Sequence, residues 1–285
     1  MNSVAASVES MPPLRETIAR HGLRAVKSLG QHFLLDLNLT RRIARAAGDL
    51  GNGTTIEIGP GPGGLTRALL IEGAVRVIAI ERDDRAIAAL GELVAAGMGR
   101  LVLQATDALE LDIAGLGPPP LRIVANLPYN ISTALLIRWL RRSDRLESMT
   151  LMFQKEVGER LTAGPRSKAY GRLSVLAQYC CRVEALFDIP PRAFVPPPKV
   201  TSTVVRLLPH TEAADLHLLP MLERVTAAAF GQRRKMLRAS LRSLVPAPEA
   251  LLGPLGIAPT ARAEELDVGQ FMLLARTFGQ GGLEK

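Results

Sequence analysis

The middle of the chain alternates short β-rich runs with helical patterns, and this order limits the fold more than any other feature of the sequence. The β-rich runs cover residues 54–58, 75–80, 101–105, 121–125 and 149–153. The helical patterns between them cover residues 65–72, 84–96 and 132–141. Alternation of this kind is typical of βαβ units with parallel strands. We therefore predict an α/β fold with a doubly wound, Rossmann-like sheet.

The segments on either side of this region have different patterns. Residues 1–26 suggest a mobile arm followed by a short helical stretch. Two later runs, 185–189 and 202–208, could close the sheet as a hairpin. From about residue 210 only helical patterns continue, including 216–230 and 232–244. We therefore expect three parts, an N-terminal segment 1–26, an α/β domain 27–209 and a small helical domain 210–285.

Composition excludes several classes of protein. The apolar runs are shorter than the roughly 20 residues that a membrane helix needs, and the first residues carry Glu9 and lack the pattern of a secretory signal. We therefore expect a cytoplasmic protein without a membrane span. The two cysteines, Cys180 and Cys181, are adjacent and cannot form a spaced metal cluster or a disulfide framework. The net charge of +8 suits a polyphosphate partner, although a GC-rich coding bias would also favour arginine.

A glycine-rich loop follows the first predicted strand. The sequence Glu57-Ile58-Gly59-Pro60-Gly61-Pro62-Gly63-Gly64 lies at a strand-to-helix junction, where glycine lets a ligand approach the backbone near a helix N-terminus. Gly59, Gly61 and Gly64 match the pattern G-x-G-x-x-G. This pattern occurs in NAD, FAD and S-adenosylmethionine sites and also in plain tight turns. The loop therefore predicts a nucleoside cofactor and leaves its identity open.

Two carboxylates follow the next two predicted strands. Glu81 stands 22 residues after Gly59, where an acidic group can accept both hydroxyls of a ribose. Asp107 follows the third strand and can accept a hydrogen bond from the adenine amine of an S-adenosyl ligand, which a dinucleotide enzyme does not need. Either residue alone could be a surface carboxylate or a helix cap. Together with the glycine loop they favour S-adenosylmethionine as the cofactor.

The loop after the fourth strand reads Asn126-Leu127-Pro128-Tyr129-Asn130 and suits an adenine amine as methyl acceptor. The lone pair of this amine is delocalised into the ring, so methyl transfer needs acceptors that hold its N–H groups. The Asn126 side-chain oxygen and the Leu127 carbonyl can supply two acceptors, and Pro128 fixes the turn. Tyr129 offers a face on which a flipped-out base can stack. We expect catalysis by positioning, with no metal, because the sulfonium of the cofactor is already a strong electrophile.

At these residues the sequence resembles the ribosomal RNA adenine dimethyltransferase family, and in particular its bacterial small-subunit members. The resemblance runs from about Lys27 to the C-terminus. It rests on five segments: Ser28-Leu29-Gly30-Gln31-His32-Phe33-Leu34, Glu57 to Gly61, Ala125 to Thr133, Phe194-Val195-Pro196-Pro197-Pro198-Lys199-Val200, and Gly231-Gln232-Arg233-Arg234-Lys235.

The resemblance implies a substrate and a set of site residues. It implies dimethylation of N6 on two adjacent adenosines near the 3′ end of small-subunit ribosomal RNA. The cofactor contacts that it implies are His32, Leu34, Gly59, Gly61, Glu81, Asp107 and Asn126. Phe194 would face Tyr129 across the target adenine and would join Asn126, Leu127, Pro128 and Tyr129 as catalytic residues. His32 stands where asparagine is frequent in the family, so how it contacts the cofactor stays open.

A basic cluster in the helical tail, formed by Arg233, Arg234, Lys235 and Arg238, suggests a second RNA-binding surface. On a helix over 232–244, Arg234 and Arg238 would share one face and meet backbone phosphates together, although a solvated helix face would have the same pattern. A pocket for one adenosine cannot choose among thousands, so recognition of shape by a second surface is required. We expect this surface to dock a partly assembled small ribosomal subunit, for which a monomer would suffice.

Other interpretations stay open. Large-subunit members of the same family and DNA adenine methyltransferases have related loops. The chain could also be an RNA-binding assembly factor without catalysis, or a nicotinamide oxidoreductase. The basic tail and the segment after Phe194 favour the small-subunit enzyme, and intact Asn126, Tyr129 and Glu81 argue against a chain without catalysis.

Overall fold

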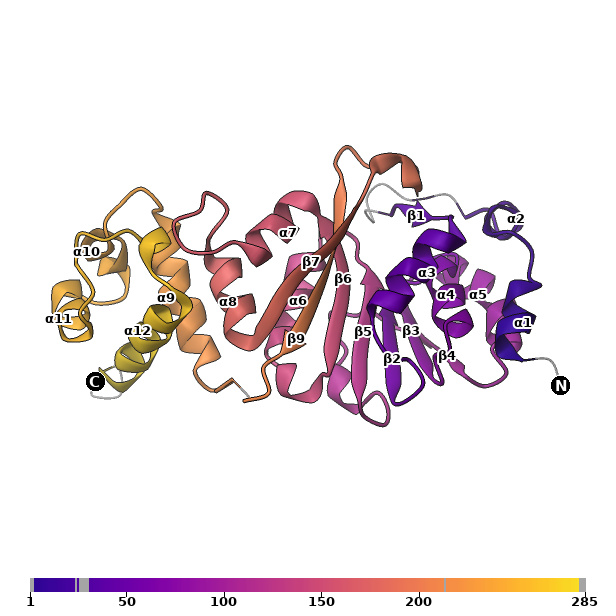
Figure 1. Ribbon diagram of the computed structural model, residues 1–285, viewed down its shortest axis with the longest axis horizontal. Helices are drawn as coiled ribbons and strands as arrows, with labels where there is room; N and C mark the ends of the chain where they lie inside the picture. The colour runs from indigo at the N-terminus through magenta and orange to yellow at the C-terminus, as the bar shows by residue number, and fades with distance from the viewer. Residues whose placement is uncertain (1–2, 24, 26–30, 213, 282–285) are drawn as a thin grey trace. The chain divides into compact units, whose positions relative to one another are not determined.

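The computed structural model describes residues 3–23, 25, 31–212 and 214–281 (Figure 1). The chain forms two compact units. The first comprises Met1–Gly158 and Glu184–Pro209, and the second comprises Glu159–Val183 and His210–Lys285.

The first unit is built on a seven-stranded sheet with the order β4-β3-β2-β5-β6-β9-β7. Its parallel strands are β2 (Thr54–Ile58), β3 (Val77–Glu81), β4 (Leu101–Ala105), β5 (Leu121–Asn126) and β6 (Ser148–Gln154). β9 (Ser202–Pro209) runs antiparallel to β6, and β7 (Cys181–Ile189) pairs beyond it. The predicted α/β sheet, including the added pair of later strands, is confirmed.

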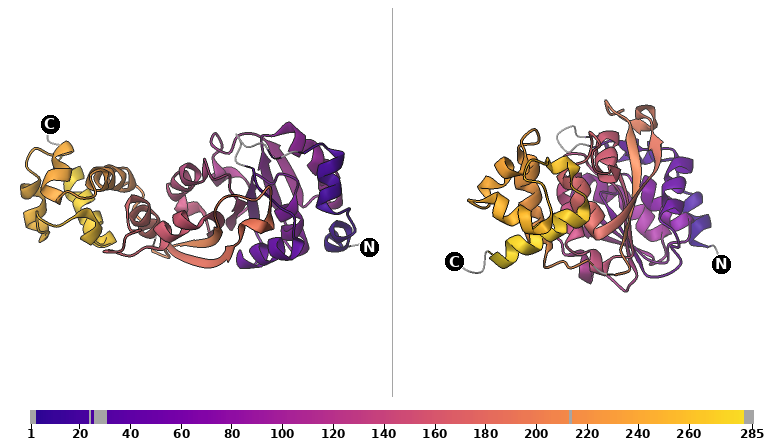
Figure 2. Two further views of the ribbon diagram at one scale, coloured as in Figure 1. Left: turned by 90° about the horizontal axis from the view of Figure 1, so that it is seen from above. Right: turned by 60° about the vertical axis from the view of Figure 1, so that its left-hand side comes forward.

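Helices cover both faces of this sheet (Figures 1 and 2). They include α3 (Leu37–Ala46), α4 (Gly64–Ile71), α5 (Asp84–Ala96) and α6 (Ser132–Leu140). Because both faces are covered, every residue of the central strands β2 and β3 is buried. Strands covered on both faces are usually apolar throughout. β3 follows this pattern up to Glu81 at its end, whereas β2 also buries two threonines and Glu57.

The N-terminal residues that the structure describes differ from the expected mobile arm. They form α1 (Val4–Glu9) and α2 (Leu14–Arg20), and α1 contacts α4 and α5. Val4 and Val8 are buried because their spacing of four residues puts both on the face toward the core. The buried Arg67 guanidinium adds a tether, since its Nη1 donates to the Pro12 carbonyl at 2.6 Å. Residues 1–2, 24 and 26 of the predicted segment lie outside the described residues.

A two-stranded pairing joins distant parts of the first unit. β1 (Phe33–Leu34) runs antiparallel to β8 (Phe194–Val195), with Leu34 opposite Phe194. Residues 32–34 are thereby held beside Phe194. The start of the first resemblance segment, Ser28-Leu29-Gly30, lies outside the described residues.

The second unit is helical. It contains the second half of α7 (Lys155–Thr162), together with α8 (Arg172–Cys180), α9 (Leu219–Gly231), α10 (Leu237–Ser240), α11 (Pro248–Leu252) and α12 (Val268–Gly281). α9 contacts α8 and α12, and the rings of Phe230 and Phe271 stack at 5.4 Å between these helices. Residues 159–183 therefore belong to the helical unit, whereas the sequence pattern places them with the sheet. The reason is that α8 packs against α9 and α12.

No helix in the parts of the chain that the structure describes is long and apolar enough to cross a membrane.

Candidate active site

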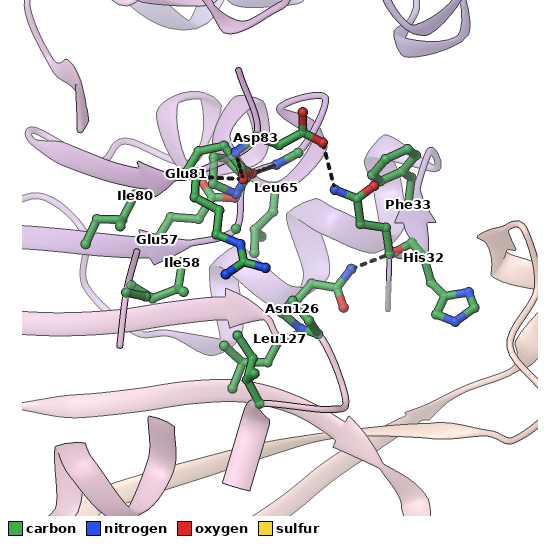
Figure 3. Close-up of a pocket in the computed structure, with 18 of the residues that line it drawn as sticks. His32, Phe33, Glu57, Ile58, Leu65, Ile80, Glu81, Asp83, Asn126 and Leu127 are labelled. Carbon is green, nitrogen blue, oxygen red and sulfur yellow. Dashed lines mark hydrogen bonds between the residues drawn. The ribbon is translucent and has the colours of Figure 1, made fainter. Parts of the chain in front are cut away.

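A pocket opens where β2, β3, β4 and β5 end (Figure 3). Because these strands are parallel, their carboxyl ends meet at one edge of the sheet, which is where open α/β folds bind ligands. Ten residues predicted from the sequence line it: His32, Leu34, Gly59, Gly61, Glu81, Asp107, Asn126, Leu127, Pro128 and Tyr129.

The glycine loop has the close packing that its sequence suggests. Gly61 has a φ of +52°, and a Cβ there would lie 3.1 Å from the Phe33 ring. A Cβ on Gly64 would lie 2.6 Å from the Leu34 carbonyl oxygen, which is closer than real contacts allow. The loop therefore needs glycine to pass beneath β1 and leave room for a ligand.

Glu81 is a hydrogen-bond acceptor in the pocket whose two carboxylate oxygens are both held by backbone N–H groups. Its Oε2 accepts the Gly61 N–H at 3.1 Å, and its Oε1 accepts the N–H groups of Arg82 and Asp83 at 2.9 and 3.0 Å. Three backbone donors hold this buried carboxylate in one orientation. Each oxygen keeps acceptor capacity for a hydroxyl, because a carboxylate has about four lone-pair sites.

Asp107 is held in a similar way at the end of the next strand. Its Oδ1 accepts the Leu109 N–H at 2.9 Å, and its Oδ2 accepts from Arg82 Nη1 at 2.7 Å. The Leu109 amide and the Arg82 guanidinium hold the pKa of this carboxyl below its usual range. Asp107 is therefore an ionised acceptor, as an adenine amine requires.

Glu57 belongs to the pocket, although the sequence analysis gave it no role. Its side chain is 1% exposed, and burial raises the pKa of its carboxyl to about 8. Oε2 has no hydrogen-bond partner among the residues that the structure describes. The signal in the sequence is an acidic residue within an otherwise uncharged buried strand, because such a residue is costly unless it has a partner.

Gln31 and Asp83 also line the pocket without having been predicted. Gln31 Nε2 donates to Asp83 Oδ2 at 3.2 Å (Figure 3). Asp83 caps α5, and hydrogen bonds from the Arg85 side chain lower its pKa to about 2. A capping aspartate is visible in the sequence, but its contact with Gln31 depends on the tertiary fold.

The Asn126 amide is fixed in one orientation. Its Nδ2 donates to the His32 main-chain carbonyl at 3.1 Å (Figure 3). A carbonyl can only accept, so the amide nitrogen must face His32, and Oδ1 is left to accept from a ligand. The structure thus prepares the acceptor that the sequence analysis assigned to Asn126.

Tyr129 is held by a residue from a distant strand. Its hydroxyl forms a 2.6 Å hydrogen bond with Ser202 Oγ at the start of β9, and Ser202 is fully buried. Burial raises the pKa of Tyr129, so the phenol stays neutral. No signal in the sequence links Ser202 with Tyr129.

The His32 ring lies with the aromatic residues. It stacks on Tyr129 with ring centroids 5.6 Å apart and meets Phe194 edge-on at 6.5 Å. Its Nδ1 lies 2.8 Å from the Pro196 carbonyl and must donate, because that oxygen only accepts. In Figure 3 the imidazole points away from Glu81. The predicted contact between His32 and the cofactor stays a prediction, with the main chain better placed for it than the ring.

The basic cluster of the second unit differs from its predicted form. The expected helix over 232–244 is wrong, because α9 ends at Gly231 and α10 begins at Leu237. Between them Met236 forms a β-bridge with Arg262, and the Leu237 N–H donates to the Ala261 carbonyl at 2.8 Å, so the backbone leaves helical geometry. Arg234 and Arg238 therefore do not share one helix.

The side chains of this cluster also differ in whether they are held by hydrogen bonds or exposed to solvent. Arg233 Nε donates to Glu264 at 2.9 Å, and its Nη2 donates to the Lys168 carbonyl at 2.7 Å. Arg234, Lys235 and Arg238 are exposed. Arg233 is thus a structural tie of the helical unit, and the other three are the candidates for RNA contact.

Residues 22–280 match the family model of ribosomal RNA adenine dimethylases. The chain belongs to this family. Ribosomal RNA adenine dimethylases use S-adenosylmethionine, so S-adenosylmethionine is the cofactor of this chain.

Two similar proteins are ribosomal RNA small subunit methyltransferase A from Paramagnetospirillum magneticum and from Rhodospirillum rubrum. The first is 66% identical and the alignment covers 93% of this chain and 94% of the relative. The second is 59% identical over 96% and 95% of the two chains.

Two solved structures share the fold of this dimethylase. A dimethyladenosine transferase from Plasmodium falciparum is 26% identical with a TM-score of 0.75, over 88% of this chain and 98% of that one. The 23S rRNA methyltransferase ErmE is 27% identical with a TM-score of 0.65, over 87% and 100% of the two chains.

Proposed function

We propose that this ribosomal RNA adenine dimethylase transfers methyl groups from S-adenosylmethionine to N6 of two adjacent adenosines near the 3′ end of small-subunit ribosomal RNA. The observation that carries the proposal is the fixed Asn126 amide, which presents an acceptor oxygen in the same pocket as the Glu81 carboxylate. The small-subunit relatives support the choice of RNA, since they are 66% and 59% identical over nearly the whole chain.

The pocket fits the cofactor. When bound, S-adenosylmethionine supplies a methyl group from a positively charged sulfonium. Glu81 would accept the two ribose hydroxyls and Asp107 the adenine amine. The orphaned Oε2 of buried Glu57 fits a cationic amino group, which would satisfy it. A cation beside Glu57 would also favour the ionised form of this carboxyl, whose pKa burial raises to about 8 in the free protein.

The target adenine would lie on the other side of Asn126. Asn126 Oδ1 and the Leu127 carbonyl would accept the two N–H groups of its amine, which turns the nitrogen lone pair out of conjugation and toward the methyl group. Tyr129, Phe194 and the His32 ring would hold the base. Catalysis by this chain is then orientation of the amine, which accounts for a site built from amides, carbonyls and rings.

The same geometry serves both methyl transfers. After the first transfer the amine has one N–H, which needs only one of the two acceptors. The other acceptor is then no longer required. The monomethylated nitrogen can turn its lone pair toward the next methyl group without a new catalytic group. Two successive transfers therefore need no second site.

Selection among the many adenosines of an RNA requires contacts outside the pocket. Exposed Arg234, Lys235 and Arg238 in the helical unit would bind backbone phosphates of a partly assembled small subunit. We also propose that the enzyme acts in the cytoplasm and as a monomer.

The direct test is transfer of tritiated methyl from S-adenosylmethionine to purified ribosomal subunits, followed by nucleoside analysis. We expect N6,N6-dimethyladenosine in small-subunit RNA and none in large-subunit RNA. Asn126→Ala should lose turnover by roughly 10² or more, since one acceptor acts in the transition state. Label confined to the large subunit would refute the choice of RNA. Thermal stabilisation by a nicotinamide dinucleotide, with no label transferred to any RNA, would refute the cofactor.

A further inference from the structure

The loop that follows Phe194 leaves apolar side chains in solvent beside the pocket. Val195 is 46% exposed and Val200 43% exposed. Large exposed hydrophobic side chains are few in the described parts of the chain, so two of them on one loop suggest a binding surface. Pro196 and Pro197 between them are exposed as well. We refer to Arg192, Val195, Pro196, Pro197, Lys199 and Val200 as the rim.

The rim also carries two free cations. Arg192 and Lys199 are exposed, and neither has an ion pair or a side-chain hydrogen bond among the residues that the structure describes. Lys155 in the same unit differs, since its Nζ binds Asp188 at 2.6 Å. A pair of unpartnered cations flanking apolar groups is available to an anionic partner with apolar faces.

The rim is tied to the site that holds the target base. Val195 lies opposite Phe33 in the pairing of β1 with β8, and Phe194 immediately before it is 2% exposed. The Pro196 carbonyl accepts from His32 Nδ1 at 2.8 Å. The chain therefore passes directly from buried Phe194 to Val195, the first apolar residue of the exposed rim. Three consecutive prolines restrict its backbone, so the surface is formed before a ligand arrives.

We propose that the rim binds the nucleotide adjoining the target adenosine. Its base and sugar would pack on Val195, Val200 and the prolines, and its phosphates would meet Arg192 and Lys199. Single-stranded RNA offers this alternation of apolar base faces and anionic groups. The inference rests on the proposed function, because it takes RNA in the pocket as given.

The size of the rim favours a nucleotide over a protein. A stable protein interface takes roughly 20–30 residues from each partner, and the rim has six. One nucleotide, in contrast, is matched by a few apolar contacts and one or two cations. The proposed substrate has two adjacent adenosines. One would lie between Tyr129 and Phe194 while its neighbour lies on the rim.

The test uses two rim variants and a matched control in the full-length enzyme. Val195→Ser/Val200→Ser removes the apolar contacts, and Arg192→Glu/Lys199→Glu reverses the charges. The control, Val75→Ser/Arg76→Glu, changes an exposed valine and an exposed arginine that precede β3, at the opposite end of the strands from the pocket. The measurements are methylation of small subunits, binding of protein-free small-subunit RNA at several salt concentrations, calorimetric affinity for S-adenosylmethionine and the thermal midpoint.

We expect both rim variants to raise the KM for subunits and to weaken RNA binding. In Val195→Ser/Val200→Ser the RNA affinity should fall by about fivefold for each valine that loses its contact. Charge reversal should also flatten the dependence of log K on log salt by roughly 1.4, as expected for two contacts to a single strand. Cofactor affinity should match wild type, and the control should match wild type in every measurement.

Three outcomes would overturn the inference. Rim variants with the RNA affinity and salt dependence of the control would show that the rim does not touch RNA. Weaker binding to intact subunits with normal binding to protein-free RNA would assign the rim to a ribosomal protein. A rim variant that loses RNA and cofactor binding together, with a lowered thermal midpoint, would make the rim a structural element. Wild-type enzyme that methylates no ribosomal RNA is a separate result, because it would refute the proposed function itself.

Discussion

At the scale of single residues, the Glu81 carboxylate both holds backbone groups of the pocket and is the proposed acceptor for the ribose of the cofactor. It accepts three backbone N–H groups, from Gly61, Arg82 and Asp83. We predict that Glu81→Ala raises the cofactor Kd by roughly 10²- to 10⁴-fold, because two charge-assisted hydrogen bonds contribute about 1.5–3 kcal/mol each. Calorimetry measures this loss.

The same substitution should lower the thermal midpoint, because alanine leaves the three backbone donors without their acceptor. Glu81→Gln is the control, since it keeps one acceptor oxygen and the shape of the side chain. A Glu81→Ala enzyme with wild-type cofactor affinity would contradict the ribose contact, whatever its stability.

Glu57 makes stability depend on pH. Its pKa is about 8 in the folded protein, compared with about 4.5 in the unfolded chain. Between these values the folded protein keeps a proton that the unfolded chain releases, so stability falls as pH rises from about 4.5 to about 8. Each pKa unit corresponds to about 1.4 kcal/mol. We predict that Glu57→Gln removes this slope, which thermal unfolding without cofactor from pH 5 to pH 9 would reveal. Parallel curves for the two proteins would show that Glu57 titrates normally.

At the scale of elements, β9 holds the loop after β5 through one hydrogen bond. Ser202 Oγ at the start of β9 and the Tyr129 hydroxyl, three residues beyond β5, are 2.6 Å apart. We predict that Ser202→Ala raises the KM for RNA several-fold with little change in cofactor affinity, because the ring loses its anchor. A double mutant with Tyr129→Phe checks the pair, since the two substitutions should be less than additive. Fully additive effects would separate the two residues.

The elements that the sequence predicts best are those that local pattern determines. The runs 54–58 and 101–105 are the observed strands β2 and β4, and the helix 84–96 is the observed α5. The helix expected over 232–244 fails because Met236 pairs with Arg262, a partner 26 positions away that no local pattern announces. The pairing of β1 with β8 spans an even longer separation.

The candidate site likewise has features that the sequence predicts and features that depend on the tertiary fold. The glycine loop, Glu81, Asp107 and Asn126 follow strands of a doubly wound sheet, so the sequence alone brings them to one edge. The orientation of the Asn126 amide could not be predicted from the sequence. Its partner is the main-chain carbonyl of His32, immediately before β1, and only the tertiary fold brings the two together. Ser202 and Gln31 are likewise brought to the site only by tertiary contacts.

At the scale of the whole molecule, the proposal gives separate tasks to the pocket and to the exposed cations of the helical unit. Arg233 is bound to Glu264, so a substitution there would disturb the fold of the helical unit. Arg234 and Lys235 lie in the turn before α10 and are exposed. They are therefore the residues with which docking can be tested without loss of packing.

We predict that Arg234→Glu/Lys235→Glu weakens binding to small subunits and leaves S-adenosylmethionine affinity unchanged, because the change lies outside the cofactor pocket. The loss of two phosphate contacts should flatten the slope of log K against log salt by roughly 1.4–1.8. Arg276→Glu on α12 controls for reversal of an exposed charge elsewhere in the same unit, with a net-charge change of two against four in the double variant. Binding of subunits by filter assay between low and physiological salt measures the slope. If the double variant binds and methylates subunits as Arg276→Glu does at every salt concentration, the turn before α10 does not dock RNA, and recognition beyond the pocket must come from another surface.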